Sequence, residues 1–318
     1  MRRSFMNRVH IICHKESGSG KGLKVWNEVT EILNSFRLSF LSYFTDTSNS
    51  ADLIVQQIMN RNHTPPLEQI IVIGGDGTLH EVVTALVELE LRIPITYIAS
   101  GSGNDFNHVW SRAATPRDMI ETMIYSRTAK EIPVLLERNL TDNTHSVVVN
   151  SVGFGFDAAV NYNRQQLSQN NFIKKFVGGK NQYRLALALT LPEIPHFNVT
   201  AKMDGKVYYF DNASLVIAMN HGYIGGGLLV DNTAIPEKSE IALAIYHDID
   251  LGAVGDILPR VFKSHDHHES EYITLIKGQH LQLFFHDHIL GQIDGEPLVK
   301  LPHEFEFTVS SYPFYLPE

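Results

Sequence analysis

The sequence predicts two domains, an α/β domain followed by a mostly antiparallel β-sandwich. The chain has 318 residues, which is long for a single hydrophobic core. Its first 130 residues alternate strand-like and helix-like segments, as expected for a parallel sheet with helices on both faces. After about Lys130 short strand-like segments dominate and few helical segments interrupt them. This change of pattern sets the predicted division of the chain.

The first part contains apolar runs separated by segments whose apolar residues recur at helical spacing. The run at 69–73 is continuously apolar, which is typical of a parallel strand buried on both faces. One helix is expected to place Leu23, Trp26, Val29 and Leu33 on its buried face. The predicted strands are residues 9–13, 38–44, 69–73 and 94–99, and the further predicted helices are 51–59, 79–89 and 116–125.

The second part is interpreted as an antiparallel sandwich-like domain. Met203-Asp204-Gly205-Lys206 predicts a tight hairpin turn, because Asp-Gly favours the turn types that join twisted strands. The predicted strands are residues 131–137, 145–153, 197–203, 206–211, 213–219, 240–246, 272–277, 280–285 and 303–309. Helices are predicted near 156–168, 180–191 and 251–264. The sequence shows no internal repeat.

Composition narrows the class of protein. Lys plus Arg total 26 against 35 Asp plus Glu, a formal net charge of -9, which argues against a general nucleic-acid binder. Hydrophobic residues make up 43% and charged residues 19%, as in soluble globular proteins. The single cysteine, Cys13, cannot form an internal disulfide and fits a reducing cytoplasm. No stretch approaches the roughly 18 apolar residues of a membrane span, so membrane contact is expected to be peripheral.

The stretch I-I-V-I-G-G-D-G-T-L-H-E, residues 70–81, predicts a phosphate site. A strand that ends in glycines exposes backbone N–H groups at the carboxyl edge of a parallel sheet, and the helix N-terminus adds partial positive charge. Thr78 and Glu81 stand at capping-box spacing and could serve only to start the helix. No capping rule requires Asp76, which indicates a role with a metal ion or a proton.

Two further glycine-rich loops follow predicted strands. I-A-S-G-S-G-N-D-F, residues 98–106, offers backbone donors, the Ser102 hydroxyl, Asn104 and Asp105, although Asp105 could also cap the next helix. H-K-E-S-G-S-G-K-G, residues 14–22, is not a Walker loop, because Lys15 and Gly22 occupy its required glycine and hydroxyl positions. None of the loops satisfies G-x-G-x-x-G with its later acid. The three loops together predict a phosphate-binding surface.

A fourth stretch, I-D-G-E-P-L at residues 293–298, lies far away in the sequence. Asp-Gly is a turn signal, so a turn alone explains part of it. Its acidic pair could also supply a general base to the nucleotide loops from the second domain.

The four stretches together resemble the diacylglycerol kinase catalytic-domain family, which includes the sphingosine kinases and is distantly related to the NAD kinases. The resemblance covers essentially the whole chain, and its closest match in length and layout is to the small soluble bacterial lipid kinases. The matching stretches are E-S-G-S-G-K-G, G-G-D-G-T-L-H-E-V-V, G-S-G-N-D-F, the G-G-G at 225–227 and I-D-G-E-P-L.

The resemblance implies an ATP-binding α/β domain at 1–130, to which the tail at about 306–318 returns, a lipid-binding β-sandwich at 131–305 and a cleft between them. It implies ATP and Mg²⁺ as cofactors. Glu296 would be the general base on a lipid hydroxyl, and Asp76 would organise magnesium or assist the proton transfer. The implied nucleotide-site residues are Ser17, Gly18, Thr45, Gly75, Asp76, Gly77, Thr78, Glu81 and Ser102, to which the loop at 98–106 adds Asn104 and Asp105.

The chain departs from the family pattern at two places. His14-Lys15 stands where the first loop usually opens with Asn-Pro, so the lysine could contact a phosphate or the nucleotide could sit differently. In A-I-P-E-K-S-E-I, residues 234–241, Lys238 occupies a position where soluble bacterial members often carry the aspartate of a structural magnesium site. We hypothesise that the Lys238 ammonium replaces that ion's charge in a salt-bridge network.

Two polar segments have plainer interpretations. Residues 264–271, S-H-D-H-H-E-S-E, are typical of a solvated loop rather than a metal site. Lys174, Lys175, Lys180 and Arg184, interleaved with Phe172, Phe176 and Tyr183, form either a solvated helix face or a surface for anionic headgroups.

The sequence therefore predicts a cytoplasmic, peripherally membrane-associating lipid kinase that moves the γ-phosphate of MgATP to a lipid hydroxyl. One alternative is a kinase of a soluble hydroxyl acceptor, as the NAD kinase relationship allows. Another is a non-catalytic nucleotide or lipid sensor, which the altered first loop supports and the intact Asp76, Asn104, Asp105 and Glu296 oppose. The expected partners are a lipid substrate and no nucleic acid, and the resemblance allows a homodimer.

Overall fold

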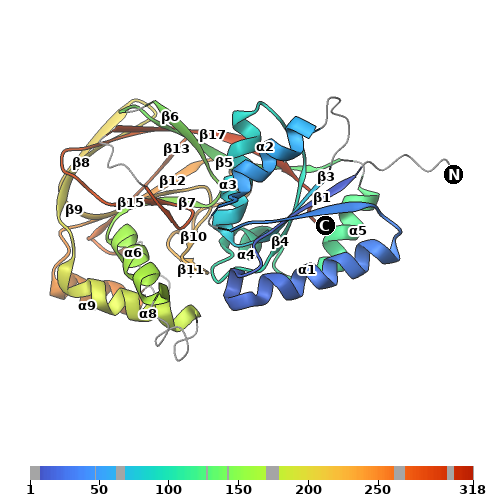
Figure 1. Ribbon diagram of the computed structural model, residues 1–318. Helices are drawn as coiled ribbons and strands as arrows, with labels where there is room; N and C mark the ends of the chain where they lie inside the picture. The colour runs from blue at the N-terminus through green and yellow to red at the C-terminus, as the bar shows by residue number, and fades with distance from the viewer. Residues whose placement is uncertain are drawn as a thin grey trace. The chain divides into compact units, whose positions relative to one another are not determined.

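The computed structural model describes residues 8–46, 48–61, 69–126, 128–141, 143–169, 179–260, 269–298 and 304–317 (Figure 1). The chain forms two compact units. Unit 1 is Met1–Ile132 with Ser311–Glu318, and unit 2 is Pro133–Ser310. The predicted fold class is confirmed: unit 1 is an α/β structure with a parallel sheet, and unit 2 is mostly antiparallel β-structure.

Unit 1 is built on a parallel sheet in the order β2-β1-β3-β4. At its β4 edge the end of β17 joins in parallel, with Phe314 opposite Ile95. All five residues of β1 are buried, as expected for a strand covered on both faces, and they include the polar His10. The strands are β1 (Val9–Cys13), β2 (Phe40–Phe44), β3 (Gln69–Gly74) and β4 (Ile95–Ala99).

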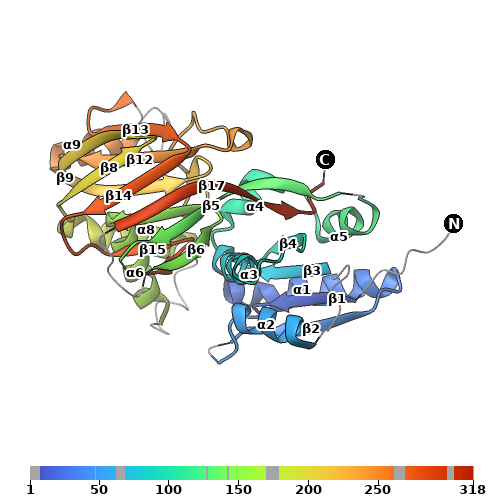
Figure 2. The same cartoon turned by 90° about the horizontal axis from the view of Figure 1, so that it is seen from above.

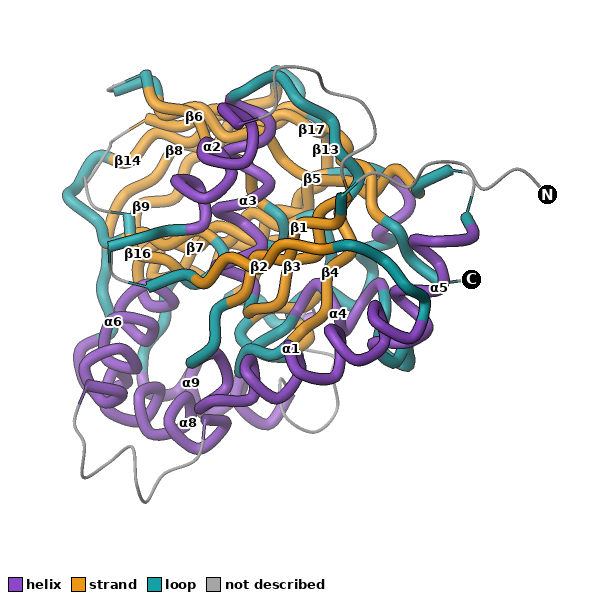
Figure 3. Tube along the Cα trace, turned by 45° about the vertical axis from the view of Figure 1, so that its right-hand side comes forward, coloured by secondary structure: helices purple, strands orange, loops and turns teal. Residues whose placement is uncertain are grey.

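Helices cover both faces of this sheet. In Figures 1 and 3, α2 and α3 lie on one face, and α1 and α5 lie on the other. The short α4 follows the loop after β4. The helices of unit 1 are α1 (Ser17–Ser35), α2 (Ala51–Arg61), α3 (Asp76–Glu88), α4 (Asp105–Trp110) and α5 (Pro116–Tyr125).

The buried face of α1 matches the predicted one in part, since Val29 and Leu33 are buried. Leu23 is 43% exposed and Trp26 is only half-buried, with its indole donating to Ser42 Oγ at 3.0 Å. The helix also buries Gly22, Val25 and Ile32, which were not predicted. The first turn is irregular, because Gly18, Ser19 and Gly20 have positive φ and regular winding starts only after them.

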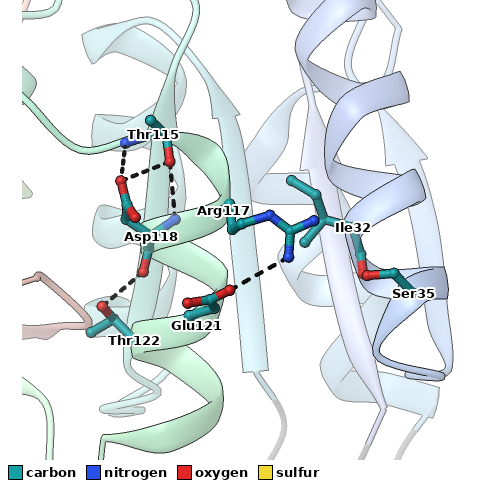
Figure 4. Close-up of polar contacts among 7 residues, drawn as sticks. All are labelled: Ile32, Ser35, Thr115, Arg117, Asp118, Glu121 and Thr122. Atoms are coloured by element: carbon teal, nitrogen blue, oxygen red, sulfur yellow. Dashed lines mark hydrogen bonds and ion pairs between the residues drawn. The ribbon is translucent and has the colours of Figure 1, made fainter.

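The start of α5 is the predicted one and has a complete capping box (Figure 4). Asp118 N donates to Thr115 Oγ1 at 3.2 Å, and Thr115 N donates to the Asp118 carboxylate at 2.8 Å. Pro116 occupies the first helical position, where the absent N–H costs nothing. These contacts satisfy backbone donors that a helix start leaves unpaired.

Unit 2 contains antiparallel strands in the order β16-β15-β7-β9-β8-β14-β17. In addition, β12 pairs with β9 and β13, and β5 pairs with β6 and β17. Figure 2 shows these strands from above. The strands are β5 (Lys130–Asn139), β6 (Thr144–Val148), β7 (Ser151–Gly155), β8 (Phe197–Met203), β9 (Lys206–Met219), β10 (Tyr223–Ile224), β11 (Leu228–Leu229), β12 (Ile241–His247), β13 (Ile273–Gly278), β14 (His280–Phe285), β15 (Gly291–Ile293), β16 (Glu296–Pro297) and β17 (Glu304–Phe314).

The hairpin predicted at residues 203–206 is confirmed. Met203 pairs with Lys206, and Asp204 and Gly205 have φ values of 48° and 84°, as a primed turn requires. The two strands predicted at 206–211 and 213–219 are a single strand, β9. Its bulge near Ala213, where the register with β8 shifts, lies between the two predicted segments.

The helices of unit 2 are α6 (Phe156–Gln169), α8 (Gly179–Thr190) and α9 (Leu251–Pro259), with short 3₁₀ turns η1 (Leu191–Glu193) and η2 (Pro236–Lys238). One core cluster lies between the strands and contains Phe154, Phe285 and Phe305. A second cluster places Ala253 and Ile257 of α9 against Ile217 and Ala244. Most of residues 264–271, and the side chains of the predicted basic and aromatic set at 172–184, lie outside the described residues.

Candidate active site

The three glycine-rich loops of unit 1 follow neighbouring parallel strands and meet at one edge of the sheet. Cys13 pairs with Ile73, and Gly74 with Ala99, so β1, β3 and β4 end at the same level. Ser100 N and Gly101 N donate to Gly74 O at 2.8 and 3.1 Å. The hydroxyls of Ser17 and Ser100 are 2.6 Å apart and buried. The loops therefore form one surface, as the sequence predicted.

Two glycines in these loops serve loop packing. A Cβ on Gly18, whose φ is +55°, would lie 2.2 Å from Ser100 O. A Cβ on Gly101 would lie 2.5 Å from Gly75 Cα. From the sequence, we predicted that the glycines let the backbone approach a phosphate closely. For Gly18 and Gly101, the structure shows a further reason: a side chain there would collide with a neighbouring loop.

Asp76 caps a helix other than its own. Its carboxylate accepts from Asp105 N at 3.0 Å and from Phe106 N at 3.4 Å, which are the first amides of α4. Asn104 precedes them with φ 60°, and its side chain donates to Gly101 O at 2.7 Å. Asp76 thus joins the loop at 70–81 to the loop at 98–106. Asp105 is the first residue of α4, not its cap.

The capping-box interpretation of Thr78 and Glu81 is wrong. The helix α3 begins at Asp76, and Gly75 is its N-cap residue without a side-chain cap. Glu81 Oε2 instead accepts from Ala51 N at 2.9 Å, the first amide of α2. Its carboxylate therefore compensates the N-terminus of a neighbouring helix. Sequence spacing alone could not reveal a partner that lies 30 residues away.

Two basic residues shape the first loop. His14 Nδ1 lies 2.8 Å from Thr45 Oγ1, so the imidazole holds the hydroxyl predicted to line the nucleotide site. The Lys15 ammonium lies 4.2 Å from the centre of the Phe44 ring, a cation–π contact. Burial raises the pKa of Cys13 to about 12, and Lys15 opposes that shift. Cys13 is therefore a neutral core thiol, while His14 and Lys15 fix the ends of β1 and β2.

The acidic turn in unit 2 has two distinct carboxylates. Ile293 pairs with Glu296 across a tight turn in which Asp294 and Gly295 have φ 50° and 91°. The buried Asp294 accepts from Val149 N and Asn150 N, both at 2.7 Å, and from Ser151 N at 3.0 Å. Glu296 is exposed. Asp294 is therefore structural, and Glu296 is the carboxylate that a ligand can reach.

A cavity of about 120 Å³ lies within unit 2, beside β9 and β12 and under the helices. Its lining is apolar except for a few side chains, among them Asp157 and Ser214. Burial raises the pKa of Asp157, while a hydrogen bond from Gln292 and the charge of Arg164 lower it. Asp157 is not among the site residues predicted from the sequence. Its signal was an acid directly after the apolar run 152–156.

In the region of the Lys238 hypothesis, a different lysine, Lys277, lies beside a buried acid. Asp231 is buried, and the ammonium that reaches it is that of Lys277, at 3.2 Å. Lys277 also donates to Thr233 Oγ1 at 2.7 Å, whereas Lys238 is exposed at the end of η2. Within the described ranges, no three His, Cys, Asp or Glu side chains gather as a metal site. Nor is any helix of this part of the chain both long and apolar enough to cross a bilayer.

The predicted site residues fall into two sets. Unit 1 carries all the predicted nucleotide-site residues, and unit 2 carries Glu296. Within unit 1, Asp76, Asn104 and Asp105 are joined through the start of α4, and Ser102 is exposed in the same loop. Gly77 and Thr78 lie in the first turn of α3, while Glu81 turns away toward α2.

Comparison with known proteins gives matches over most of the chain. Residues 8–135 match the diacylglycerol kinase catalytic domain, and residues 150–313 match the YegS C-terminal NAD kinase beta sandwich-like domain. A candidate lipid kinase of Staphylococcus epidermidis is 26% identical over 262 residues, 82% of this chain and 81% of the relative. Another from Staphylococcus aureus is 22% identical over 92% of each chain. A candidate diacylglycerol kinase from Bacillus anthracis has the same fold, with a TM-score of 0.75 at 19% identity over 99% of this chain and 97% of that chain.

Proposed function

The chain belongs to the diacylglycerol kinase catalytic-domain family, and on that premise we propose that it transfers the γ-phosphate of MgATP to the hydroxyl of a lipid. Its relatives are named as lipid kinases, which supports the kinase class. The acceptor and the nucleotide are our proposal.

The apolar cavity of unit 2 is the observation that carries the lipid assignment. Leucine, isoleucine and valine side chains from α6, α8, α9, β9, β10 and β11 line it, and β12 contributes Tyr246. Burying an acyl chain there releases water from apolar surface at about 25 cal/mol per Å². A small polar acceptor would instead leave its hydroxyls without hydrogen-bond partners against the same walls. The cavity therefore favours a lipid over a soluble acceptor.

The loops of unit 1 supply what a triphosphate needs. The first turn of α3, with Gly75 as N-cap and without a side-chain cap, presents backbone N–H groups and partial positive charge. Asn104 Oδ1 is buried without a hydrogen-bond partner among the described residues, so a ligand donor that reached this loop would satisfy it. Magnesium would arrive with ATP and neutralise phosphate charge, with Asp76 as its candidate ligand.

Glu296 is the proposed general base. Glu296 is exposed, and hydrogen bonds hold Asp294 and Gly295, the two residues before it, in place. Its side chain can therefore reach an acceptor hydroxyl while the backbone of the turn stays ordered. The carboxylate takes the hydroxyl proton as the oxygen attacks the γ-phosphorus, and ADP leaves. This chemistry requires Glu296 and the nucleotide held by unit 1 to meet in the reacting complex.

A lipid acceptor also implies contact with its source. Because acyl chains reside in a bilayer, we propose that the protein associates peripherally with a membrane while it binds the acceptor. A homodimer remains an expectation from the family resemblance, which sedimentation velocity would test.

The test is transfer of ³²P from ATP to an extracted lipid pool in the presence of magnesium. We expect labelled lipid from the parent and a fall of roughly 10²- to 10⁴-fold for Glu296→Gln, which keeps the shape but removes the base. Glu304→Gln, an exposed glutamate of the same unit, serves as the matched control and should keep parental activity.

Other results of this experiment would contradict a part of the proposal. Labelled soluble product without labelled lipid would replace the lipid by a soluble hydroxyl acceptor. A folded protein that binds ATP and labels nothing would be a nucleotide or lipid sensor. Parental activity of Glu296→Gln with lipid product would remove Glu296 from the proposed mechanism and leave the lipid kinase assignment intact.

A further inference from the structure

Gln292, in β15, bridges the cavity wall and the turn before Glu296. Its side chain donates from Nε2 to Asp157 Oδ2 at 2.6 Å and accepts at Oε1 from Gly295 N at 2.6 Å. A backbone N–H can only donate, so the bond from Gly295 fixes which way the amide faces. The Nε2 group must then point to Asp157, and that carboxylate must accept.

The turn is held on its other sides as well. The Asp294 carboxylate accepts from the two backbone amides between β6 and β7 and from the first amide of β7. Asn161 Nδ2 donates to Gly295 O, and Arg164 donates to Asn161 Oδ1 at 2.9 Å. Both peptide groups of Gly295 are therefore fixed, its N–H by Gln292 and its carbonyl by Asn161.

The other end of the bridge lies at the cavity. Asp157, in the first turn of α6, is among the cavity-lining residues. Gly153 leaves room for the pair, since a Cβ there would lie 2.1 Å from Asp157 Oδ2 and 3.0 Å from Gln292 Nε2. A half-buried acid, a buried amide and the glycine beneath them form one packed unit between the cavity and the turn.

We propose that Gln292 is a positioning residue for phosphoryl transfer, holding the Asp294–Gly295 turn, and with it Glu296, in a fixed place relative to the acyl cavity. This inference rests on the proposed function, in which Glu296 is the base and the cavity binds the acceptor. Gln292 acts through Gly295 and touches no reacting atom. Small displacements of a catalytic group cost rate, so the bridge should affect kcat more than nucleotide binding.

The chain permits a swap that preserves every bond of the bridge. Gln292→Glu alone places two carboxylates in contact, which breaks the pair. Adding Asp157→Asn restores it with reversed polarity: the side-chain amide introduced at position 157 would donate to the new glutamate, whose other oxygen accepts from Gly295 N. The double variant keeps the parent's volume and net charge.

Two further variants complete the set. Gln292→Leu removes both bonds of the bridge. Gln282→Leu in β14 is the matched control, since among the described residues the Gln282 side chain bonds only to Glu306.

Steady-state kinetics on lipid vesicles with MgATP should show kcat lowered about 10- to 100-fold in Gln292→Leu and Gln292→Glu, with the KM for MgATP unchanged. The double variant should regain kcat to within about tenfold of the parent, and Gln282→Leu should match the parent. Hydrogen exchange of the Gly295 amide should be faster in Gln292→Leu, and parental in the double variant.

The outcomes separate this role from the proposed function. A parent that labels no lipid would defeat the proposed function and this role together. An active parent with parental kcat in Gln292→Leu would overturn the positioning role alone. A double variant no better than Gln292→Glu, despite restored protection of the Gly295 amide, would also overturn it, because a restored bridge would then not restore the rate.

Discussion

At the scale of single residues, Asp76 combines two roles that substitution can separate. Its carboxylate caps α4 through Asp105 N and Phe106 N, and it is also the proposed partner of magnesium or of the transferred proton. Asp76→Asn keeps one oxygen to accept from these amides, whereas Asp76→Ala keeps none. We expect Asn to cost a few tenths of a kcal/mol of stability and Ala about 1 kcal/mol, by analogy with capping side chains.

Lipid phosphorylation should respond differently from stability. Both Asp76 variants should lose about 10²-fold or more in transfer, because both remove the charge. Urea unfolding gives the free energy of unfolding of each variant, and ³²P transfer on the same preparations gives its activity. Parental transfer by Asp76→Asn would restrict Asp76 to capping α4.

At the scale of elements, the start of α5 offers a clean test of local sequence signals. Thr115→Ala removes the hydroxyl that accepts from Asp118 N, and we expect it to lower the free energy of unfolding by about 1 kcal/mol. Thr122→Ala, in the same helix, is the matched control: Thr122 Oγ1 donates to the backbone carbonyl Asp118 O, and alanine is the better helix former. Urea unfolding of both variants measures this difference. Equal losses of unfolding free energy in the two variants would show that Thr115 does not act as a specific cap.

The elements that sequence patterns predicted are those with local causes. The strand at 9–13, the helix at 116–125 and the hairpin at 203–206 follow from apolar runs, a proline start and an Asp-Gly turn. The missed pieces, such as α4 and the short β10 and β15, are too brief to show a period. The bonds of Glu81 to α2 and of Gln292 to Asp157 join residues distant in sequence, so only the folded chain reveals them.

At the scale of the whole molecule, the last residues of the chain belong to the unit formed by the first. The end of β17 pairs with β4, and Tyr312 donates its hydroxyl to Ile93 O at 2.9 Å. Phe314 is fully buried and packs on Phe106 of α4, with ring centres 4.7 Å apart. The helix that follows the third glycine-rich loop is therefore supported by residues more than 200 positions later.

This dependence predicts a large loss of stability from one remote side chain. Phe314→Ala should lower the free energy of unfolding of unit 1 by about 3–5 kcal/mol, the usual cost of emptying a fully buried phenylalanine site. Phe284→Ala, which removes a ring that is 41% exposed in unit 2, is the matched control and should leave unit 1 unchanged. Both tryptophans, Trp26 and Trp110, lie in unit 1, so their fluorescence during urea unfolding reports on that unit alone. If the two variants gave the same fluorescence midpoint as the parent, the C-terminal residues would not support unit 1. A midpoint lowered only by Phe314→Ala would show that the loops proposed to bind the nucleotide depend on the end of the chain for their stability.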